Sequence, residues 1–208
     1  DALHPMPVLS LAQLAVIFLV GPFVPRVVRR FGKRNAYIGA GLIATAFSIV
    51  AFLAPNVWVA IAALLISLPA IMMVNIIIWA LEADTVEYGE WKTGARQEGV
   101  TYATFSFTRK PGQAVGAAIA AYALALTGYD GAALQQTAET EWGIRAAAAL
   151  LPADATFLAA AIMLFYPLTD ERHAEILVEI EQRREQGSDP GLSTAALTFD
   201  GTDRMLSA

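Results

Sequence analysis

The sequence predicts an all-α fold, a polytopic membrane helix bundle. Of the 208 residues, 56% are hydrophobic and only 16% are charged, and the mean hydropathy of +0.51 is high for a soluble domain. Five apolar runs are each long enough for a transmembrane helix, which needs about 20 residues. The apolar residues in these runs are continuous rather than alternating, which excludes a transmembrane β-barrel.

The predicted bundle occupies residues 1–168 and contains about five spans. The spans cover residues 7–28, 36–54, 57–81, 99–126 and 144–166. The fifth contains Asp154 shortly after Pro152, where we expect a polar notch at a kink.

The C-terminal part of the chain is more polar than the bundle. Residues 169–186 are predicted to form a cytoplasmic amphipathic helix, because Ile176, Leu177 and Ile180 recur at helical spacing among charged residues. Residues 187–208 are predicted to be disordered.

Loop charge predicts the orientation of the chain in the cytoplasmic (inner) membrane. The loop after the first span holds five basic residues, which favours the cytoplasm; they are Arg26, Arg29, Arg30, Lys33 and Arg34. The uncharged connection at residues 55–56 and the acidic loop at 127–145 are predicted outside. This arrangement puts the N-terminus of the chain outside and the C-terminus inside. An odd number of spans that begins outside, without a targeting segment, leads us to expect that upstream spans are absent from this chain.

Composition argues against several other functions. The chain has no cysteine, and its two histidines, His4 and His173, lie near opposite ends, so we expect no metal site and no cofactor. No nucleophile–base pair or phosphate-binding loop is present, so we do not expect an enzyme. No basic stripe is present, so we do not expect nucleic acid as a partner.

Arg109 and Lys110 form a basic pair inside the fourth predicted span, which contains no acidic residue. If that span enters hydrocarbon near Val100, a rise of ~1.5 Å per residue puts Lys110 about 15 Å deep, near the midplane. A cation there costs at least ~2.5–3.5 kcal/mol unless it faces a partner or a watery cavity. We therefore predict a substrate- or cation-coupling role for this pair. The alternative is that the side chains snorkel to the cytoplasmic interface.

Two uncharged polar residues are predicted to line the same cavity. Ser106 lies one helical turn before Lys110 on the same face. Asn75 lies in the apolar third span and needs a partner at that depth, which sugar hydroxyls would supply. A hydrogen bond between helices would explain Asn75 equally well.

Small residues predict close helix contacts. Gly112 and Gly116 form a small-xxx-small pair in the fourth span, and Gly39 and Gly41 lie in the second. Ordinary bundle packing accounts for all of them.

Charged residues of the predicted cytoplasmic loops can form a gate. Asp84 and Glu87 are three residues apart, on one face of a helix end, and Arg96 follows across a short loop with Gly89 and Gly94. Together with Arg29 and Arg30 of the other loop, they can seal the inner face. Exposed ion pairs contribute only ~0–1 kcal/mol each, which suits a gate that opens repeatedly. The alternative is a solvated loop without such a role.

Three stretches resemble the glycoside–pentoside–hexuronide:cation symporters of the major facilitator superfamily. The stretch at 83–99 (ADTVEYGEWKTGARQEG) resembles the loop between that family's tenth and eleventh helices, and SFTRK with GQA at 106–114 continues the likeness. Residues 143–170 resemble its last helix and tail. Residues 21–34 resemble the superfamily's cytoplasmic signature, with Pro25 in place of the usual acidic residue. Pro111 also departs from the family pattern.

The resemblance implies a fold and a function. Residues 7–185 would be family helices eight to twelve, the C-terminal half of a twelve-helix carrier. The implied function is symport of a glycoside or related sugar with H⁺ or Na⁺ by alternating access, with the lipid bilayer and the missing N-terminal half as partners. The family uses acidic and arginine positions like those of the predicted gate as a cytoplasmic lock, and holds most of its essential carboxylates in the other half.

Two other functions remain open at this stage. A carrier or flippase of amphipathic lipids would have a wider apolar cavity instead of sugar-binding groups. A non-transporting membrane fragment or scaffold is the second alternative, because half a carrier cannot form a two-sided site alone.

Overall fold

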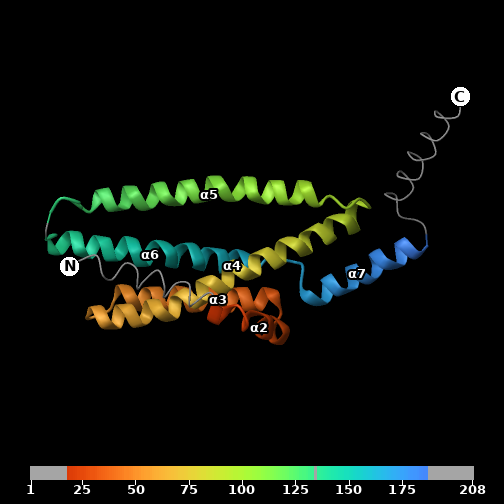
Figure 1. Cartoon of the computed structure of the whole chain (residues 1–208), viewed down its shortest axis with the longest axis horizontal. Coiled ribbons are helices and arrows are strands. Elements are labelled where there is room, and N and C mark those ends of the chain that lie inside the picture. The colour runs from red at the N-terminus through yellow and green to blue at the C-terminus, as the bar shows by residue number, and fades with distance from the viewer. Residues whose placement is uncertain (1–17, 134, 187–208) are drawn as a thin grey trace, which may run out of the picture. The chain divides into compact units, whose positions relative to one another are not determined.

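The computed structural model describes residues 18–133 and 135–186, and every regular element in these ranges is a helix (Figure 1). The helices are α2 (Val24–Phe31), α3 (Lys33–Phe52), α4 (Val57–Thr93), α5 (Glu98–Leu126), α6 (Ala138–Met163) and α7 (Asp170–Glu185). The all-α prediction is confirmed. The predicted disorder of residues 187–208 concerns residues outside the described ranges.

Three of the described helices are long and apolar enough to cross a membrane, namely Lys33–Phe52, Trp58–Thr93 and Ala138–Met163. They contain most of the second, third and fifth predicted spans, whereas much of the first lies outside the described residues. The fourth predicted span forms α5, whose 29 residues are about 43 Å long. Its length suffices for a span, but Arg109, Lys110 and its polar N-terminal half lower its mean hydropathy.

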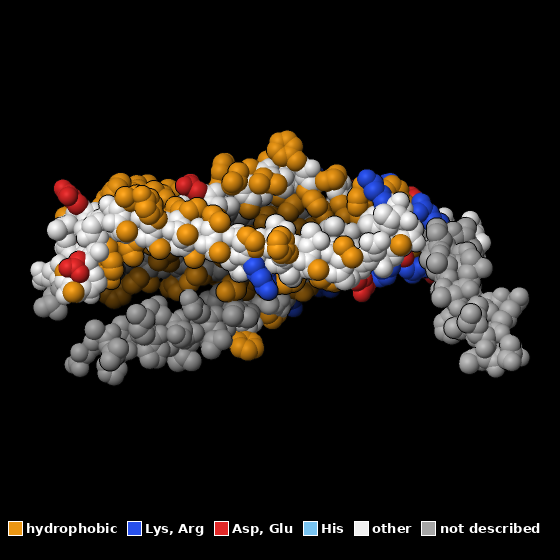
Figure 2. Space-filling view, turned by 90° about the horizontal axis from the view of Figure 1, so that it is seen from above, with side chains coloured by type: hydrophobic (Ala, Val, Ile, Leu, Met, Phe, Trp, Pro, Cys, Tyr) orange, Lys and Arg blue, Asp and Glu red, His pale blue; other side chains and the backbone are white. Residues whose placement is uncertain are grey.

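Apolar side chains lie on the outside of these helices in large numbers, and Figure 2 shows them spread over the visible face. Trp58, Phe107, Tyr122 and Phe157 are each more than half exposed. Water-soluble monomers rarely expose so much apolar surface. This surface fits contact with lipid or with another membrane-embedded polypeptide.

The described residues belong to two compact units, and the division crosses α4 and α5. Unit 1 comprises residues up to Ile78 and from Arg109 to Pro167. Unit 2 comprises Trp79–Thr108 and the chain from Leu168 onward.

The core of unit 1 is the contact between α3 and α6, which pack side by side. Their facing surfaces bury small residues, namely Ala40, Gly41, Ala44, Ala153 and Ala160. A Cβ atom on Gly41 would lie 3.1 Å from the Cβ of Ala160. Gly41 therefore permits the close helix contact that was predicted for it as a small residue of the second span. A Cβ on Gly39 would meet open space, so Gly39 has no such role among the described residues.

Polar side chains also connect the helices of unit 1. The hydroxyls of Thr45 on α3 and Thr156 on α6 are 3.0 Å apart, and those of Ser48 on α3 and Ser67 on α4 are 3.1 Å apart. Arg34 donates to the carbonyl oxygens of Met163 and Leu164 at the C-terminus of α6. A guanidinium there satisfies carbonyls that have no partner within the helix.

Two predicted boundaries were wrong. The stretch at 21–34, predicted as a loop, is mostly helix α2. The chain turns at Gly32, whose positive φ of 80° suits a residue without a Cβ. The helix of the third predicted span does not end at Leu81: α4 stays helical to Thr93 and ends before Gly94, where φ is 72°. Gly89 therefore lies within α4, not in a loop.

The last membrane helix also begins earlier than predicted. The side chain of Thr137 accepts from the backbone N–H of Thr140 and caps α6, and Glu139 and Glu141 favour its first turn. The connection between α5 and α6 is correspondingly shorter than predicted. Asp154 is exposed on α6, and the residue that packs against α3 is its neighbour Ala153. The predicted polar notch is therefore not part of the α3–α6 core.

The amphipathic helix predicted at 169–186 is α7. It starts at the cap residue Thr169, whose hydroxyl accepts from the N–H of Arg172. Ile176 and Ile180 are buried, whereas Leu177 is 40% exposed. The apolar stripe is thus narrower than predicted.

Candidate functional site

The charged extension of α4 carries three carboxylates at one-turn spacing, namely Asp84, Glu87 and Glu90. Residues three apart lie on the same face of a helix. Asp84 and Glu90 are buried, and Glu87 is half-buried. Because α4 continues beyond Leu81, acids that were predicted at a helix end and in a cytoplasmic loop form a row on one face of a helix in unit 2.

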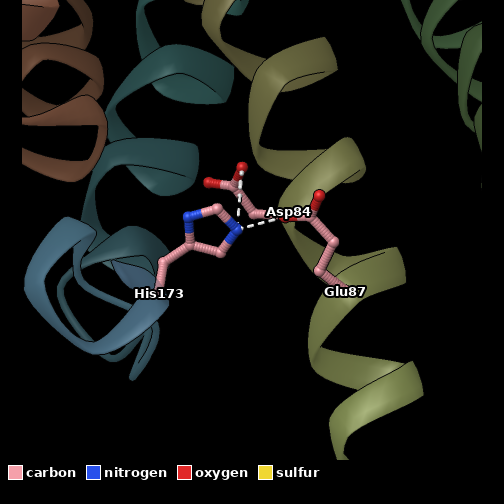
Figure 3. A group of neighbouring side chains, drawn as sticks. All are labelled: Asp84, Glu87 and His173. Carbon is pink, nitrogen blue, oxygen red and sulfur yellow. Dashed lines mark hydrogen bonds and ion pairs between the residues drawn. The ribbon is translucent and has the colours of Figure 1, made fainter. Parts of the chain in front are cut away.

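His173 of α7 meets the first two of these acids (Figure 3). Its Nε2 atom is 2.5 Å from Oε2 of Glu87 and 3.6 Å from Oδ1 of Asp84. The position of the ring follows from the start of α7, since Thr169 caps the helix and its carbonyl accepts from the N–H of His173. The imidazole thus joins two segments that are 86 residues apart.

Sequence reasoning missed His173 because it considered only the distance between the two histidines along the chain. A local signal was present. His173 precedes Ile176 by three residues and Ile180 by seven, so it lies on the inward stripe of the amphipathic helix. That pattern indicates a half-buried imidazole with a polar partner.

The third acid of the row, Glu90, binds two arginines. Its carboxylate is 3.0 Å from Arg96 and also accepts from Arg184 of α7. Arg96 makes a second ion pair with Glu98, at 2.6 Å. Two hydrogen bonds raise the pKa of Arg96 above its usual value, and the bond to Glu98 contributes more than the bond to Glu90. In this structure Arg96 thus pairs with Glu90 and Glu98, and its predicted part in the gate with Asp84 and Glu87 stays a prediction.

Further contacts attach α7 to α4. The indole Nε1 of Trp91 donates to Glu179 at 2.6 Å, and Arg183 donates to the backbone carbonyl of Trp91 at 2.8 Å. The two turns of α4 from Asp84 to Trp91 therefore contact α7 through charged and aromatic side chains.

The other predicted gate residues lie in unit 1. Arg29 and Arg30 are exposed on α2, and the guanidinium of Arg30 lies 5.7 Å from the ring centre of Phe31. Their predicted part in the gate stays a prediction.

The predicted coupling residues are distributed over α4 and α5. Lys110 and Arg109 are exposed in the part of α5 that belongs to unit 1, and Lys110 makes no ion pair within the described residues. Asn75 is exposed on α4, and its amide donates to the carbonyl of Ile71 at 3.0 Å. Ser106 is half-buried in the part of α5 that belongs to unit 2. Their roles stay predictions.

Comparison with known proteins gives the chain its family. Residues 5–170 match the family model described as MFS/sugar transport protein, where MFS denotes the major facilitator superfamily. The glucuronide carrier protein homolog of Escherichia coli (strain K12) is 45% identical over 170 residues, which are 78% of this chain and 36% of that protein. The symporter YjmB of Bacillus subtilis (strain 168) is 41% identical over 169 residues, covering 80% of this chain and 36% of that protein.

A third relative is less similar. A proposed sulfoquinovose importer of Salmonella typhimurium (strain LT2) is 32% identical over 192 residues, which cover 89% of this chain and 40% of that protein. The chain thus spans 36–40% of the length of these three relatives. No solved structure matches it. The chain is an integral membrane protein that belongs to the MFS/sugar transport protein family.

Proposed function

We propose that this chain forms the C-terminal half of a symporter that carries a sugar together with H⁺ or Na⁺. The observation that carries the proposal is the 45% identity to a glucuronide carrier homolog over 170 residues. The covered share of the relatives, 36–40%, fits about half of a carrier built from two bundles. The other half would supply the remaining wall of the substrate site.

The substrate class we propose is an anionic sugar. Two of the relatives carry glucuronide or sulfoquinovose in their names, and both of these sugars bear an acidic group. Arg109 and Lys110 in α5 supply positive charge in a helix with no buried residue. In a cavity of low dielectric, a cation attracts a carboxylate or sulfonate far more strongly than in water. Lys110 would bind either the substrate or a carboxylate of the other half, and alternation between these partners would couple the two sites.

Ser106 and Asn75 would complete the polar lining. The Ser106 hydroxyl is one turn from Lys110 on α5, and the Asn75 amide uses one donor on the Ile71 carbonyl. An amide offers two donors and an acceptor, so Asn75 keeps capacity for a sugar hydroxyl.

The acidic row on α4 would form the inner gate. We propose that Asp84 and Glu87 pair with Arg29 and Arg30 when the carrier faces outward and separate from them when it faces inward. Glu90 would hold Arg96 in place in both states, because its carboxylate is buried and has two arginine partners.

We propose an orientation with α4's acidic end in the cytoplasm of the cell and the α3–α4 connection outside. The chain contains no cysteine, so single cysteines report accessibility on a clean background. A cysteine at Asn56 should react with an impermeant maleimide in intact cells, and one at Gly94 only after the cells are opened. Swapped accessibility would contradict the orientation.

Uptake by the full-length gene product in cells or membrane vesicles tests the function. A Na⁺ gradient and a proton gradient are imposed in separate experiments, and we expect a labelled glucuronide to accumulate with the one whose ion is coupled. A neutral methyl glucoside should accumulate much less. Vesicles that contain only this chain serve as the control and should show no uptake. Equal uptake of both sugars would contradict the anionic substrate class, and equilibration without accumulation would contradict symport.

A further inference from the structure

We infer that Asp84, Glu87 and His173 form a binding site for a divalent transition-metal ion of the Zn²⁺ class. One ligand atom from each side chain lies within 4.8 Å of the other two. The ligands come from two helices of unit 2, α4 and α7 (Figure 3). The inference goes beyond sugar transport and does not depend on it.

The distances suit a tetrahedral ion. Metal–ligand bonds of about 2.0–2.2 Å in a tetrahedral Zn²⁺ site place the ligand atoms roughly 3.4 Å apart. The 3.6 Å between Nε2 of His173 and Oδ1 of Asp84 already fits this spacing. The 2.5 Å between Nε2 and Oε2 of Glu87 must widen by about 1 Å. Glu87 can make this move, since its side chain is the most exposed of the three, at 26% against 13% for His173 and 8% for Asp84.

The charge of the cluster also favours a cation. Two carboxylates face one imidazole, so these three side chains hold more carboxylate charge than one cationic ring could balance. A divalent ion would neutralise this excess in a partly buried position, where charge interactions are stronger than in water.

The donor set identifies the class of ion. One imidazole nitrogen with two carboxylates suits Zn²⁺ and its first-row neighbours. Mg²⁺ and Ca²⁺ prefer sets made only of oxygen atoms. Three protein ligands leave a fourth tetrahedral position, which a water molecule would fill.

A metal ion here would fasten α7 to α4. The two helices already meet through Trp91 with Glu179 and through Glu90 with Arg184. A bound ion adds a further cross-link one to two turns before these contacts on α4. His173 lies just beyond residues 5–170, which the family model matches.

Calorimetry with ZnCl₂ and Co²⁺ absorption spectroscopy test the site. The chain should be purified in detergent without a polyhistidine tag, and no sugar is needed. We expect one high-affinity ion per chain, and visible d–d bands typical of four-coordinate Co²⁺ that Zn²⁺ abolishes.

Three substitutions that preserve shape distinguish a metal site from an ion pair. His173→Gln keeps a donor toward Glu87 but removes the imidazole, whereas Asp84→Asn and Glu87→Gln remove one carboxylate each. Each should weaken Zn²⁺ binding at least ~10-fold, since even loss of a group that only orients a metal ligand costs 10–100-fold. The controls are His4→Gln, the other histidine, and Glu181→Gln on α7, whose side chain is 67% exposed. Both controls should bind Zn²⁺ like the unmodified chain.

Two results would overturn the inference. One is an unmodified chain that binds neither Zn²⁺ nor Co²⁺ above the level of a variant with all three substitutions. The other is a His173→Gln variant that keeps full affinity while circular dichroism shows its helix content unchanged. Neither result bears on uptake, so loss of the metal site and loss of the transport proposal are separately observable.

Discussion

The α3–α6 pair and α5 differ in how their small residues are used. A Cβ added to Gly41 of α3 would lie 3.1 Å from Ala160, whereas Cβ atoms added to Gly112 and Gly116 of α5 would have nothing within 4 Å. The α3–α6 contact buries several alanines, and α5 buries no residue along its 29. Small residues therefore mark a contact already made in α3 and a surface without a close neighbour among the described residues in α5.

The open surface of α5 also carries the basic pair. Phe107, Val115, Ile119 and Tyr122 are each more than half exposed around Arg109 and Lys110. A surface that is apolar but contains two cations suits neither plain lipid nor plain water. The other half of the proposed carrier, with a polar cavity between the halves, would satisfy both the apolar and the charged part of this surface.

The largest expected effect comes from the open helix. Lys110→Ala in the full-length gene product should abolish coupled sugar uptake while insertion and expression stay normal, because the variant removes the cation proposed to couple the two sites. Initial rates of gradient-driven uptake measure this effect.

Two further variants serve as controls for Lys110. Arg145→Ala removes an exposed cation elsewhere and should leave uptake unchanged. Lys110→Arg keeps the charge and should retain part of the activity. Near-normal concentrative uptake by Lys110→Ala would show that the side chain only snorkels to the interface.

Much of this architecture was predictable from the sequence because long apolar runs have few alternatives to membrane helices. The end of α4 was not predictable in the same way. Charged residues after Leu81 signal the cytoplasm but do not stop a helix, and only Gly94 does so. The partners of Arg96 were not predictable for the same reason, since the continued helix places Glu90 beside it.

The contact of His173 with Asp84 and Glu87 needed tertiary information. Helix period identified the inward stripe of α7, but no local pattern says which helix that stripe meets. The roles proposed for Lys110, Arg109, Ser106 and Asn75 involve a second half of the carrier, and they stay predictions.

The second effect concerns packing and compares the two helices directly. Gly41→Leu should destabilise this chain by about 1–3 kcal/mol, the usual cost of adding bulk to a filled contact. Gly116→Leu on α5 should change its stability by less than about 0.5 kcal/mol, since the space there is open. Unfolding of the purified chain by denaturant titration in mixed micelles measures both. Equal destabilisation by the two leucines would remove the distinction between the helices.

A third, smaller effect extends the comparison to charges. Glu90 already has arginine partners in unit 2, whereas Glu87 is proposed to find Arg29 only in the outward-facing carrier. Glu87→Lys should lower the fraction of carriers that face outward, because it breaks the proposed ion pair. Adding Arg29→Glu should restore about 1 kcal/mol of the free energy that favours the outward-facing state, which is the upper range for exposed ion pairs. Accessibility of a single outer cysteine reports that fraction, with EDTA present to exclude metal effects. Coupling below about 0.5 kcal/mol would be simple additivity and would argue against the gate.

The smallest effect separates hydrogen bonds between helices from those within one helix. The Thr45 hydroxyl lies 3.0 Å from that of Thr156, across the α3–α6 contact, whereas the Thr104 hydroxyl donates only to Val100 one turn back on α5. Thr45→Val keeps the shape and removes the interhelical bond, which should cost about 0.6 kcal/mol, the average for such bonds in membrane proteins. Thr104→Val should cost close to nothing, because its partner carbonyl keeps its backbone bond within the helix. The same denaturant titration resolves the pair when several protein preparations are averaged. A cost for Thr104→Val that equals or exceeds the cost for Thr45→Val would mean that α5 has neighbours in the isolated chain, and the contrast between the two helices would fail.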